Sequence, residues 1–252
     1  MNPVSINIKN LCKSFDGTPI LNDISLNIEP GEIFVIMGPS GSGKTVLLRH
    51  IIGLLTPDSG EVIIDGESSL SAHLQDRIRM SMVFQNGGLL NSLSVKENVG
   101  LYLSEHRLKP PAEINQIVEN ELRRLNLNKA DAEKYPYELS GGMKKRVAIA
   151  RTIVMEPNVV LYDEPTSELD PVMARIVVEE IARVHKQYHQ TNVIVTHDRE
   201  LAFEIGNHIA ILINGTLVKV GTPEQIRNSN DSTLINFLTT NYKLTHKQQN
   251  YE

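Results

Sequence analysis

Residues 33–55 read IFVIMGPSGSGKTVLLRHIIGLL, and this stretch decides the fold class of the chain. Residues 33–37 form a continuous apolar run, which is typical of a strand buried on both faces of a parallel sheet. A glycine-rich segment, residues 38–45, follows at once, and the apolar spacing of residues 44–55 predicts a helix. Strand, glycine loop and helix in this order predict a phosphate-binding loop in an α/β protein.

Each part of the predicted phosphate loop has a chemical reason. Glycines let the backbone curl, so that its N–H groups surround the β- and γ-phosphates of a nucleotide. Lys44 supplies a cation, and the hydroxyl of Thr45 is a hard oxygen ligand for Mg²⁺. A chance glycine turn is the alternative, which the flanking strand and helix disfavour. The predicted nucleotide-binding residues of the loop are Gly38, Pro39, Ser40, Gly41, Ser42, Gly43, Lys44 and Thr45.

The composition limits the classes of protein to which the chain can belong. It has 252 residues with a formal net charge of -5, which argues against a general nucleic-acid binder. A single cysteine, Cys12, excludes an intrachain disulfide and suits a reducing compartment. No apolar run approaches the roughly 18–20 residues of a membrane-spanning helix, and the first residues lack the profile of a secretion signal. We therefore expect a cytoplasmic protein.

The segment from about residue 87 to 140 differs from the strand-rich sequence around it. Ser94 and Glu97 have the spacing of a capping box and predict the start of a helix, and residues 112–127 predict a second, amphipathic one. Alternating strands and helices then return. We expect one domain over residues 1–240, in which this helical subdomain is inserted, and a polar tail over 241–252.

Two acids end the strand that is predicted at residues 158–164. Asp163 is expected to hold Mg²⁺ beside the phosphate loop, and Glu164 to orient or deprotonate the attacking water. An acid pair at a strand end is by itself more often a turn or a helix cap. The phosphate loop in the same chain favours the catalytic interpretation.

Three further side chains are candidates for the same site. Gln85 ends another apolar strand, and its amide is expected to contact Mg²⁺ or the water; a solvated glutamine is the alternative. His197 also ends an apolar strand, where a neutral imidazole can donate to the γ-phosphate, unless it is a core histidine. Phe15 is expected to stack on a purine ring, with core packing as the alternative.

A second anion-binding helix start is predicted in ELSGGMKKRVAIAR, residues 138–151. Ser140, Gly141 and Gly142 begin an amphipathic helix, whose first N–H groups and positive dipole end attract an anion. The basic residues that follow, Lys144, Lys145 and Arg146, are interpreted as the solvated face of this helix.

The chain resembles the ATP-binding-cassette ATPases from about residue 4 to 240. The resemblance implies a P-loop NTPase (RecA-like) α/β core, an antiparallel β subdomain and an inserted helical subdomain. It also implies ATP and Mg²⁺ as cofactors, with Thr45, Gln85 and Asp163 at the metal. The motifs that carry it are, in chain order, Phe15, the phosphate loop, Gln85, LSGGM at 139–143, LYDEP at 161–165, SELD at 167–170 and His197.

The resemblance further implies that two copies bind ATP between them, head to tail. Ser140, Gly141 and Gly142 would then contact the nucleotide of the partner copy, as would Asp170. Two residues depart from the family pattern: Met143 stands where glutamine is common, and Glu168 where a small residue is common. Neither position carries a group that we assign to the chemistry.

A narrower resemblance concerns what the ATPase drives. Residues 84–99, together with Met143 and the basic residues after it, look most like the ATPases of Mla-type phospholipid transporters. This implies an integral-membrane permease, an MCE-type lipid-binding partner and a place on the cytoplasmic face of the inner membrane. Two alternatives stay open: a cassette of a small-solute importer, and a soluble cassette protein outside transport.

Overall fold

The computed structural model of the chain describes residues 2–239, so the predicted polar tail lies outside the described residues. Within that range the strands form an antiparallel sheet in the order β2-β1-β4-β5 and a mainly parallel sheet in the order β10-β9-β3-β8-β7-β6. The antiparallel sheet contains β1 (Ile6–Phe15), β2 (Thr18–Ile28), β4 (Ser59–Ile64) and β5 (Glu67–Ser68). The parallel sheet contains β3 (Ile33–Met37), β6 (Met80–Val83), β7 (Val159–Asp163), β8 (Thr191–Thr196) and β9 (His208–Ile213), with β10 (Thr216–Gly221) antiparallel to β9.

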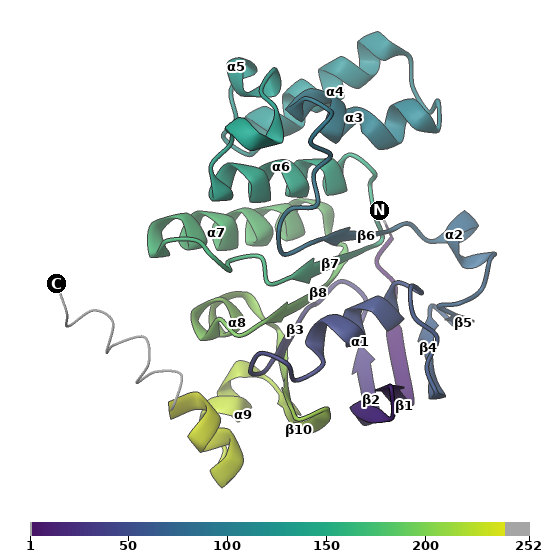
Figure 1. The fold of residues 1–252 in the computed structure, drawn as a ribbon, viewed down its shortest axis with the longest axis vertical. Helices are drawn as coiled ribbons and strands as arrows, with labels where there is room; N and C mark the ends of the chain where they lie inside the picture. The colour runs from purple at the N-terminus through teal and green to yellow at the C-terminus, as the bar shows by residue number, and fades with distance from the viewer. Residues whose placement is uncertain (1, 240–252) are drawn as a thin grey trace, which may run out of the picture.

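The helices divide between the sheets and a separate helical part, which lies at the top of Figure 1. The helical part contains α3 (Val95–Glu105), α4 (Pro111–Arg124) and α5 (Lys129–Ala132), which pack against one another and, through α3 and α4, on α6 (Gly141–Ile153). The other helices are α1 (Lys44–Ile51), α2 (Leu74–Arg77), α7 (Pro171–Tyr188), α8 (Arg199–Ile205) and α9 (Pro223–Arg227), with a 3-10 turn at Pro136–Glu138 and a helical stretch at 232–239. This arrangement confirms the predicted α/β core with an antiparallel β subdomain and an inserted helical subdomain.

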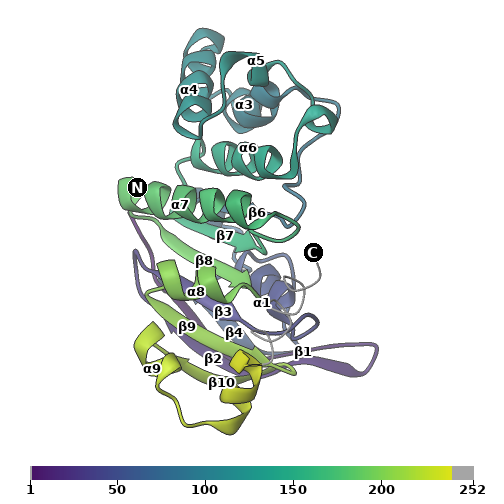
Figure 2. The same ribbon diagram turned by 90° about the vertical axis from the view of Figure 1, so that its left-hand side faces the viewer.

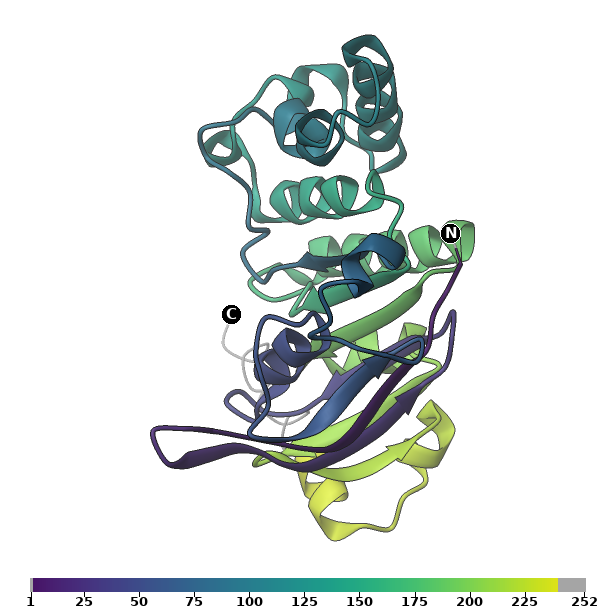
Figure 3. The same ribbon diagram turned by 90° about the vertical axis from the view of Figure 1, so that its right-hand side faces the viewer.

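The parallel sheet is buried on both faces, as the apolar run of β3 predicts. Phe34 and Ile36 pack with Leu48 of α1 and with the antiparallel sheet in one core. The alternating neighbour Val35 belongs to a second core, which joins α6, α7 and α8 to the helical part. In Figures 2 and 3 the helical part and the antiparallel sheet lie at opposite ends, and the hairpin of β1 and β2 extends outward.

Local signals fix several element boundaries. The predicted capping box is present, because the Ser94 side chain accepts the N–H of Glu97 and the Glu97 carboxylate accepts the N–H of Ser94. The helix predicted to run to residue 55 is shorter and ends at Ile51. Gly53, at φ +77°, turns the chain into the left-handed region and stops the helix there.

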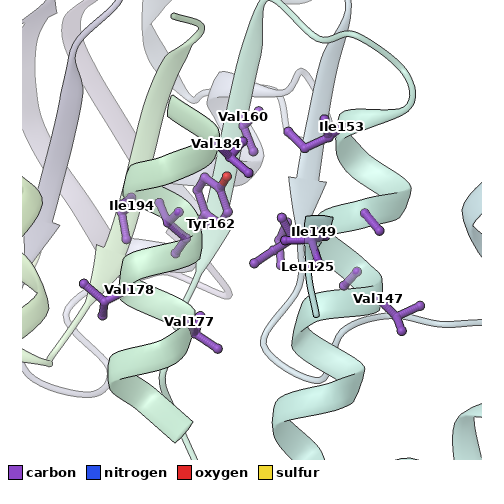
Figure 4. Close-up of a cluster of buried hydrophobic side chains, with 14 of the residues drawn as sticks. Leu125, Val147, Ile149, Ile153, Val160, Tyr162, Val177, Val178, Val184 and Ile194 are labelled. Atoms are coloured by element: carbon purple, nitrogen blue, oxygen red, sulfur yellow. The ribbon is translucent and has the colours of Figure 1, made fainter. Parts of the chain in front are cut away.

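Tyr162, in the middle of the sheet, carries a buried polar atom that nothing in the described residues satisfies. Its side chain has 0% relative exposure, and its hydroxyl has no hydrogen-bond partner within residues 2–239. Figure 4 shows the ring between β7 and the helices that cover it, and burial raises the pKa of the hydroxyl. The neighbouring apolar side chains include Ile149, Ile153, Val160, Val177 and Ile194.

We expect Tyr162→Phe to stabilise the protein. The change removes a desolvated hydroxyl while keeping the packed ring, so the free energy of unfolding should rise by about 1 kcal/mol in urea denaturation. Tyr188→Phe is the matched control, because the Tyr188 hydroxyl accepts from Arg124 (2.6 Å) and lies 3.2 Å from Glu121. That variant should lose stability, and a Tyr162→Phe protein no more stable than the parent would contradict our account of this hydroxyl.

Candidate nucleotide-binding site

The carboxyl ends of four parallel strands meet at one edge of the sheet. β3 leads into the phosphate loop, β6 toward Gln85, β7 into Asp163 and Glu164, and β8 into His197. β8 lies between β3 and β7, so Asp163 is not on a strand next to that of the loop. It nevertheless reaches the loop, because the Thr45 hydroxyl donates to Asp163 Oδ1 at 2.9 Å. Residues 118 positions apart in sequence therefore form one site.

The phosphate loop offers a ligand mainly hydrogen-bond donors, from its backbone N–H groups and the Ser42 hydroxyl. Gly41 and Gly43 adopt φ of +80° and +101°, where a residue with a Cβ would be strained. No side chain caps the start of α1 and its first turn carries no acid, so its N–H groups are available to an anion. The Ser42 hydroxyl is buried and has no partner among the described residues. These features fit a bound polyphosphate.

Lys44 lies over the loop as a buried cation. Its ammonium donates to the carbonyls of Gly38 (2.9 Å) and Pro39 (3.0 Å). It also lies 3.4 Å from Glu164 Oε1, so the charge of Lys44 is shared between the loop and the catalytic candidate. A buried cation in this place can neutralise phosphate oxygens.

Glu164 and His197 form a hydrogen-bonded pair, which the sequence did not predict. Glu164 Oε2 lies 2.9 Å from His197 Nδ1 and accepts the backbone N–H of His197 and the hydroxyl of Thr196, each at 3.2 Å. Glu164 has φ of +47°, in the left-handed region. The contact uses Nδ1 of His197, and the side chain is half exposed, so Nε2 is free of this contact.

The surroundings shift the pKa values of the two acids in opposite directions. Burial opposes ionisation of Glu164, but the hydrogen bonds from His197 and the charges of His197 and Lys44 outweigh it and lower the pKa of Glu164. Burial raises the pKa of Asp163, with the Thr45 hydroxyl opposing it. The Glu164 hydrogen bond raises the pKa of His197, with burial opposing it.

The oxygen donors at this edge fit Mg²⁺ held together with phosphate. Thr45 and Asp163 provide a hydroxyl and a carboxylate within 2.9 Å of each other. Residues 2–239 contain no group of three or more His, Cys, Asp and Glu side chains placed to hold a metal. Mg²⁺ commonly uses one or two protein ligands plus substrate phosphates, so a small donor set is sufficient. Gln85 is exposed just beyond β6, where its side chain can turn toward this edge.

The residues expected to act on a partner copy have local roles in the single chain. Ser140 is the N-cap of α6 and accepts the N–H of Met143 at 3.3 Å, and Gly141 and Gly142 form the first turn behind it. Asp170 caps α7 by accepting the N–H groups of Val172 and Met173. Their role toward a second nucleotide stays a prediction.

Phe15 lies at the end of β1, where the hairpin turns. Its ring is 42% exposed, and the Lys13 ammonium lies 5.5 Å from the ring centroid. Residues 20 and 21, further along the same hairpin, lie against Gly43 of the phosphate loop. The exposure argues against core packing as the reason for this aromatic side chain.

The interpretation of the basic residues after the signature glycines as a solvated face is wrong for Lys145. Lys145 is 5% exposed, and its ammonium donates to the carbonyls of Gln85 and Glu164. Burial lowers the pKa of Lys145, while the charges of nearby acids oppose the shift. The spacing from Gly142 through Lys145 to Ile149 and Thr152 places Lys145 on the buried stripe of α6, and this periodicity was the available signal.

The comparison with known families agrees with this geometry. A family profile described as ABC transporter matches residues 21–167. The chain belongs to the ABC transporter ATPase family. As an ABC ATPase it hydrolyses ATP and uses Mg²⁺. Residues 2–239 contain no helix that is both long enough and apolar enough to cross a membrane.

Curated relatives and solved structures extend over most of the cassette. The chain is 40% identical over 226 residues to the sulfate/thiosulfate import ATP-binding protein CysA of Nitrosomonas europaea, which covers 88% of this chain and 62% of that protein. It is 37% identical over 239 residues to the probable ribonucleotide transport ATP-binding protein mkl of Mycobacterium leprae, covering 93% and 69%. The ATP-binding cassette MJ0796, in a dimeric post-hydrolysis state bound to ADP and Pi, matches with a TM-score of 0.79 and 31% identity over 86% of this chain and 98% of that one.

Proposed function

We propose that this ABC ATPase is the cytoplasmic subunit of a transporter that moves phospholipids or related hydrophobic molecules between membranes. Its partners would be an integral-membrane permease at the cytoplasmic face of the inner membrane and an MCE-type lipid-binding protein. Two copies would close head to tail around ATP, and the dimeric structure of the cassette MJ0796 supports a paired arrangement. Hydrolysis would then reopen the pair and drive the permease.

One observation carries the lipid-transport proposal: the two segments that resemble Mla-type ATPases touch each other. Lys145 donates to the carbonyl of Gln85, and Arg151 donates to the carbonyls of Gly88 (2.8 Å) and Gly87 (3.1 Å). The loop after Gln85 and the helix after the signature glycines therefore form one surface. A resemblance shared by two contacting segments supports a common partner more strongly than either segment alone.

That surface also presents apolar side chains. Phe84 and Leu90 are 43% and 46% exposed. Buried Asn98 fixes the loop between them and α3, because it accepts the N–H of Leu90 and donates to three carbonyls. A rigid loop with exposed apolar side chains is a suitable docking surface for a membrane subunit.

In the proposed cycle the residues of one copy bind the nucleotide and hold the water. Bound ATP with Mg²⁺ supplies the phosphoryl group and its leaving group. The phosphate loop and Lys44 bind the phosphates, and Thr45 and Asp163 hold the metal. Glu164 is kept ionised by His197 and Lys44, so it accepts a proton from the attacking water. Ser140, Gly141, Gly142 and Asp170 of the other copy close the site.

A small-solute importer is the second candidate, because several relatives are named as sulfate/thiosulfate import proteins. The same cassette chemistry serves both functions. The associated proteins therefore distinguish them.

The proposal predicts which proteins remain with the chain after gentle extraction. The tagged chain should be purified from detergent-solubilised membranes, and its partners identified by mass spectrometry. We expect an integral-membrane permease together with an MCE-type protein, since both belong to the proposed assembly. A permease accompanied by a solute-binding protein and no MCE-type protein would favour the importer instead.

Two variants make the purification specific to the docking surface. Leu90→Asp should lose the partners while it still binds ATP, because the loop lies outside the phosphate site. Leu108→Asp, at an equally exposed leucine (47%) between α3 and α4, is the matched control and should keep them. Equal recovery of partners with both variants would place the docking surface elsewhere.

A further inference from the structure

Lys145 connects the helix of the signature glycines to two adjacent strand ends. It lies in the second turn of α6, and its ammonium reaches the carbonyl of Gln85 beyond β6 and that of Glu164 beyond β7, the latter at 3.1 Å. β6 and β7 are parallel neighbours, so their ends lie side by side. One buried cation thus holds both the loop that leads to the docking surface and the residue proposed as the base.

The Glu164 peptide needs such support. Glu164 adopts φ of +47°, a region that is unfavourable for a residue with a long side chain. Its carbonyl accepts from Lys145 at 3.1 Å, from the hydroxyl of Ser167 at 2.8 Å and from the N–H of Ser167 at 3.2 Å. Its carboxylate is fixed separately by His197 and Thr196. Lys145 therefore helps to hold the backbone turn from which the Glu164 side chain extends.

The charge of Lys145 is matched by its surroundings. Acidic side chains of Asp163, Glu164 and Glu168 act on its ammonium. Burial disfavours the charged form of a lysine, and here two carbonyl acceptors and the opposite charges of three acids counter part of that cost. A polar but uncharged side chain at position 145 could keep hydrogen bonds to the carbonyls but would lose the attraction to the acids.

We propose that Lys145 is a positioning residue for ATP hydrolysis. It fixes the backbone of Glu164 in its own copy and connects that residue to the loop at Gln85 and to α6. The inference rests on the proposed role of Glu164 as base. Because Ser140 is the N-cap of α6, the helix that is predicted to face the partner's nucleotide also holds the proposed base of its own site. Through α6, Lys145 connects the nucleotide site of its own copy with the residues that are predicted to contact the partner's nucleotide.

The test separates turnover from binding. Lys145→Met keeps an unbranched side chain but removes the donors and the charge, while Lys44, Thr45 and the loop are untouched. We expect kcat for ATP to fall about tenfold to a hundredfold, as for a misplaced catalytic group. The KM for ATP and the binding of a fluorescent ATP analogue should stay within about twofold. If the Met variant does not fold, Lys145→Gln removes the charge but keeps an amide donor, and kcat should then fall less than in the Met variant while the KM for ATP stays within about twofold.

Lys144→Met is the matched control. Lys144 is the preceding residue of α6, and its side chain makes no hydrogen bond within residues 2–239, so its loss should leave kcat unchanged. Loss of turnover and ATP binding together in the Lys145 variant would overturn the inference, because Lys145 would then only maintain the fold. Wild-type kcat in that variant would overturn it as well.

A double-mutant cycle tests the route through Glu164. In single-turnover hydrolysis, Lys145→Met should add almost no loss to Glu164→Gln, because a residue that acts through another is non-additive with it. Two independent losses that multiply would overturn the inference. If Glu164→Gln alone keeps normal turnover, the proposed role of Glu164 fails; if only the Lys145 variant is normal, the failure is confined to Lys145.

Discussion

Glu164→Gln is expected to lower steady-state ATP hydrolysis by about a hundredfold to ten-thousandfold, the range for loss of a general base. Gln has the shape of Glu, and its carbonyl oxygen can still accept from His197 Nδ1 and Thr196, which now contact Oε2. Gln lacks the negative charge of Glu164, which the contacts with His197 and Lys44 favour by lowering the pKa of Glu164. Phosphate release measured under saturating ATP and Mg²⁺ gives the loss directly.

The same substitution should trap the closed pair. If hydrolysis reopens the dimer, Glu164→Gln with ATP and Mg²⁺ should elute from gel filtration as a dimer, and with ADP as a monomer. Adding Ser140→Arg to it should restore the monomer while each chain still binds ATP, since Ser140 is exposed at the start of α6. Ser104→Arg, at an exposed position of α3, is the matched control and should leave the dimer intact. A monomer under all conditions would count heavily against a shared site.

The features that the sequence predicted correctly are those that depend on interactions between residues close together in the chain. The buried strand, the glycine loop and the capping box of Ser94 and Glu97 each depend on residues within a few positions, and all three are present. The strand-end placement of Asp163 and His197 followed from the apolar runs before them. The fold class followed because these local units allow few arrangements.

What the sequence did not reveal depends on long-range placement. The order of β3, β8 and β7 is set by crossover connections, and it brings His197 against Glu164 rather than leaving each free at the edge. Lys145 was misjudged because lysine is rarely buried, a rule that fails where carbonyl ends of neighbouring strands supply acceptors. No periodic pattern in the sequence predicts which side chains pair across the edge of a sheet.

Lys44→Ala is expected to lower the affinity for the nucleotide itself. Truncating one partner of a buried charge-assisted contact costs about 2–5 kcal/mol, which is about thirtyfold to several thousandfold in ATP affinity. Lys44 is 6% exposed, donates to the carbonyl of Gly38 in the loop and lies 3.4 Å from Glu164, so the variant loses a buried charge at the loop. Equilibrium dialysis measures the affinity, and the rise in melting temperature with ATP should vanish in the variant.

The design of this experiment distinguishes binding from folding. Lys9→Ala is the control, because Lys9 makes only an exposed ion pair with Glu61 at 3.4 Å, and its affinity for ATP should match the parent. The Lys44 variant also loses the ion pair with Glu164, so the unfolding of this variant without ATP reports whether that ion pair matters to the fold. Near-parental ATP affinity in Lys44→Ala would mean that phosphate is held by backbone N–H groups alone. The loop would then bind as a helix start does, and the role of the cation would be confined to catalysis.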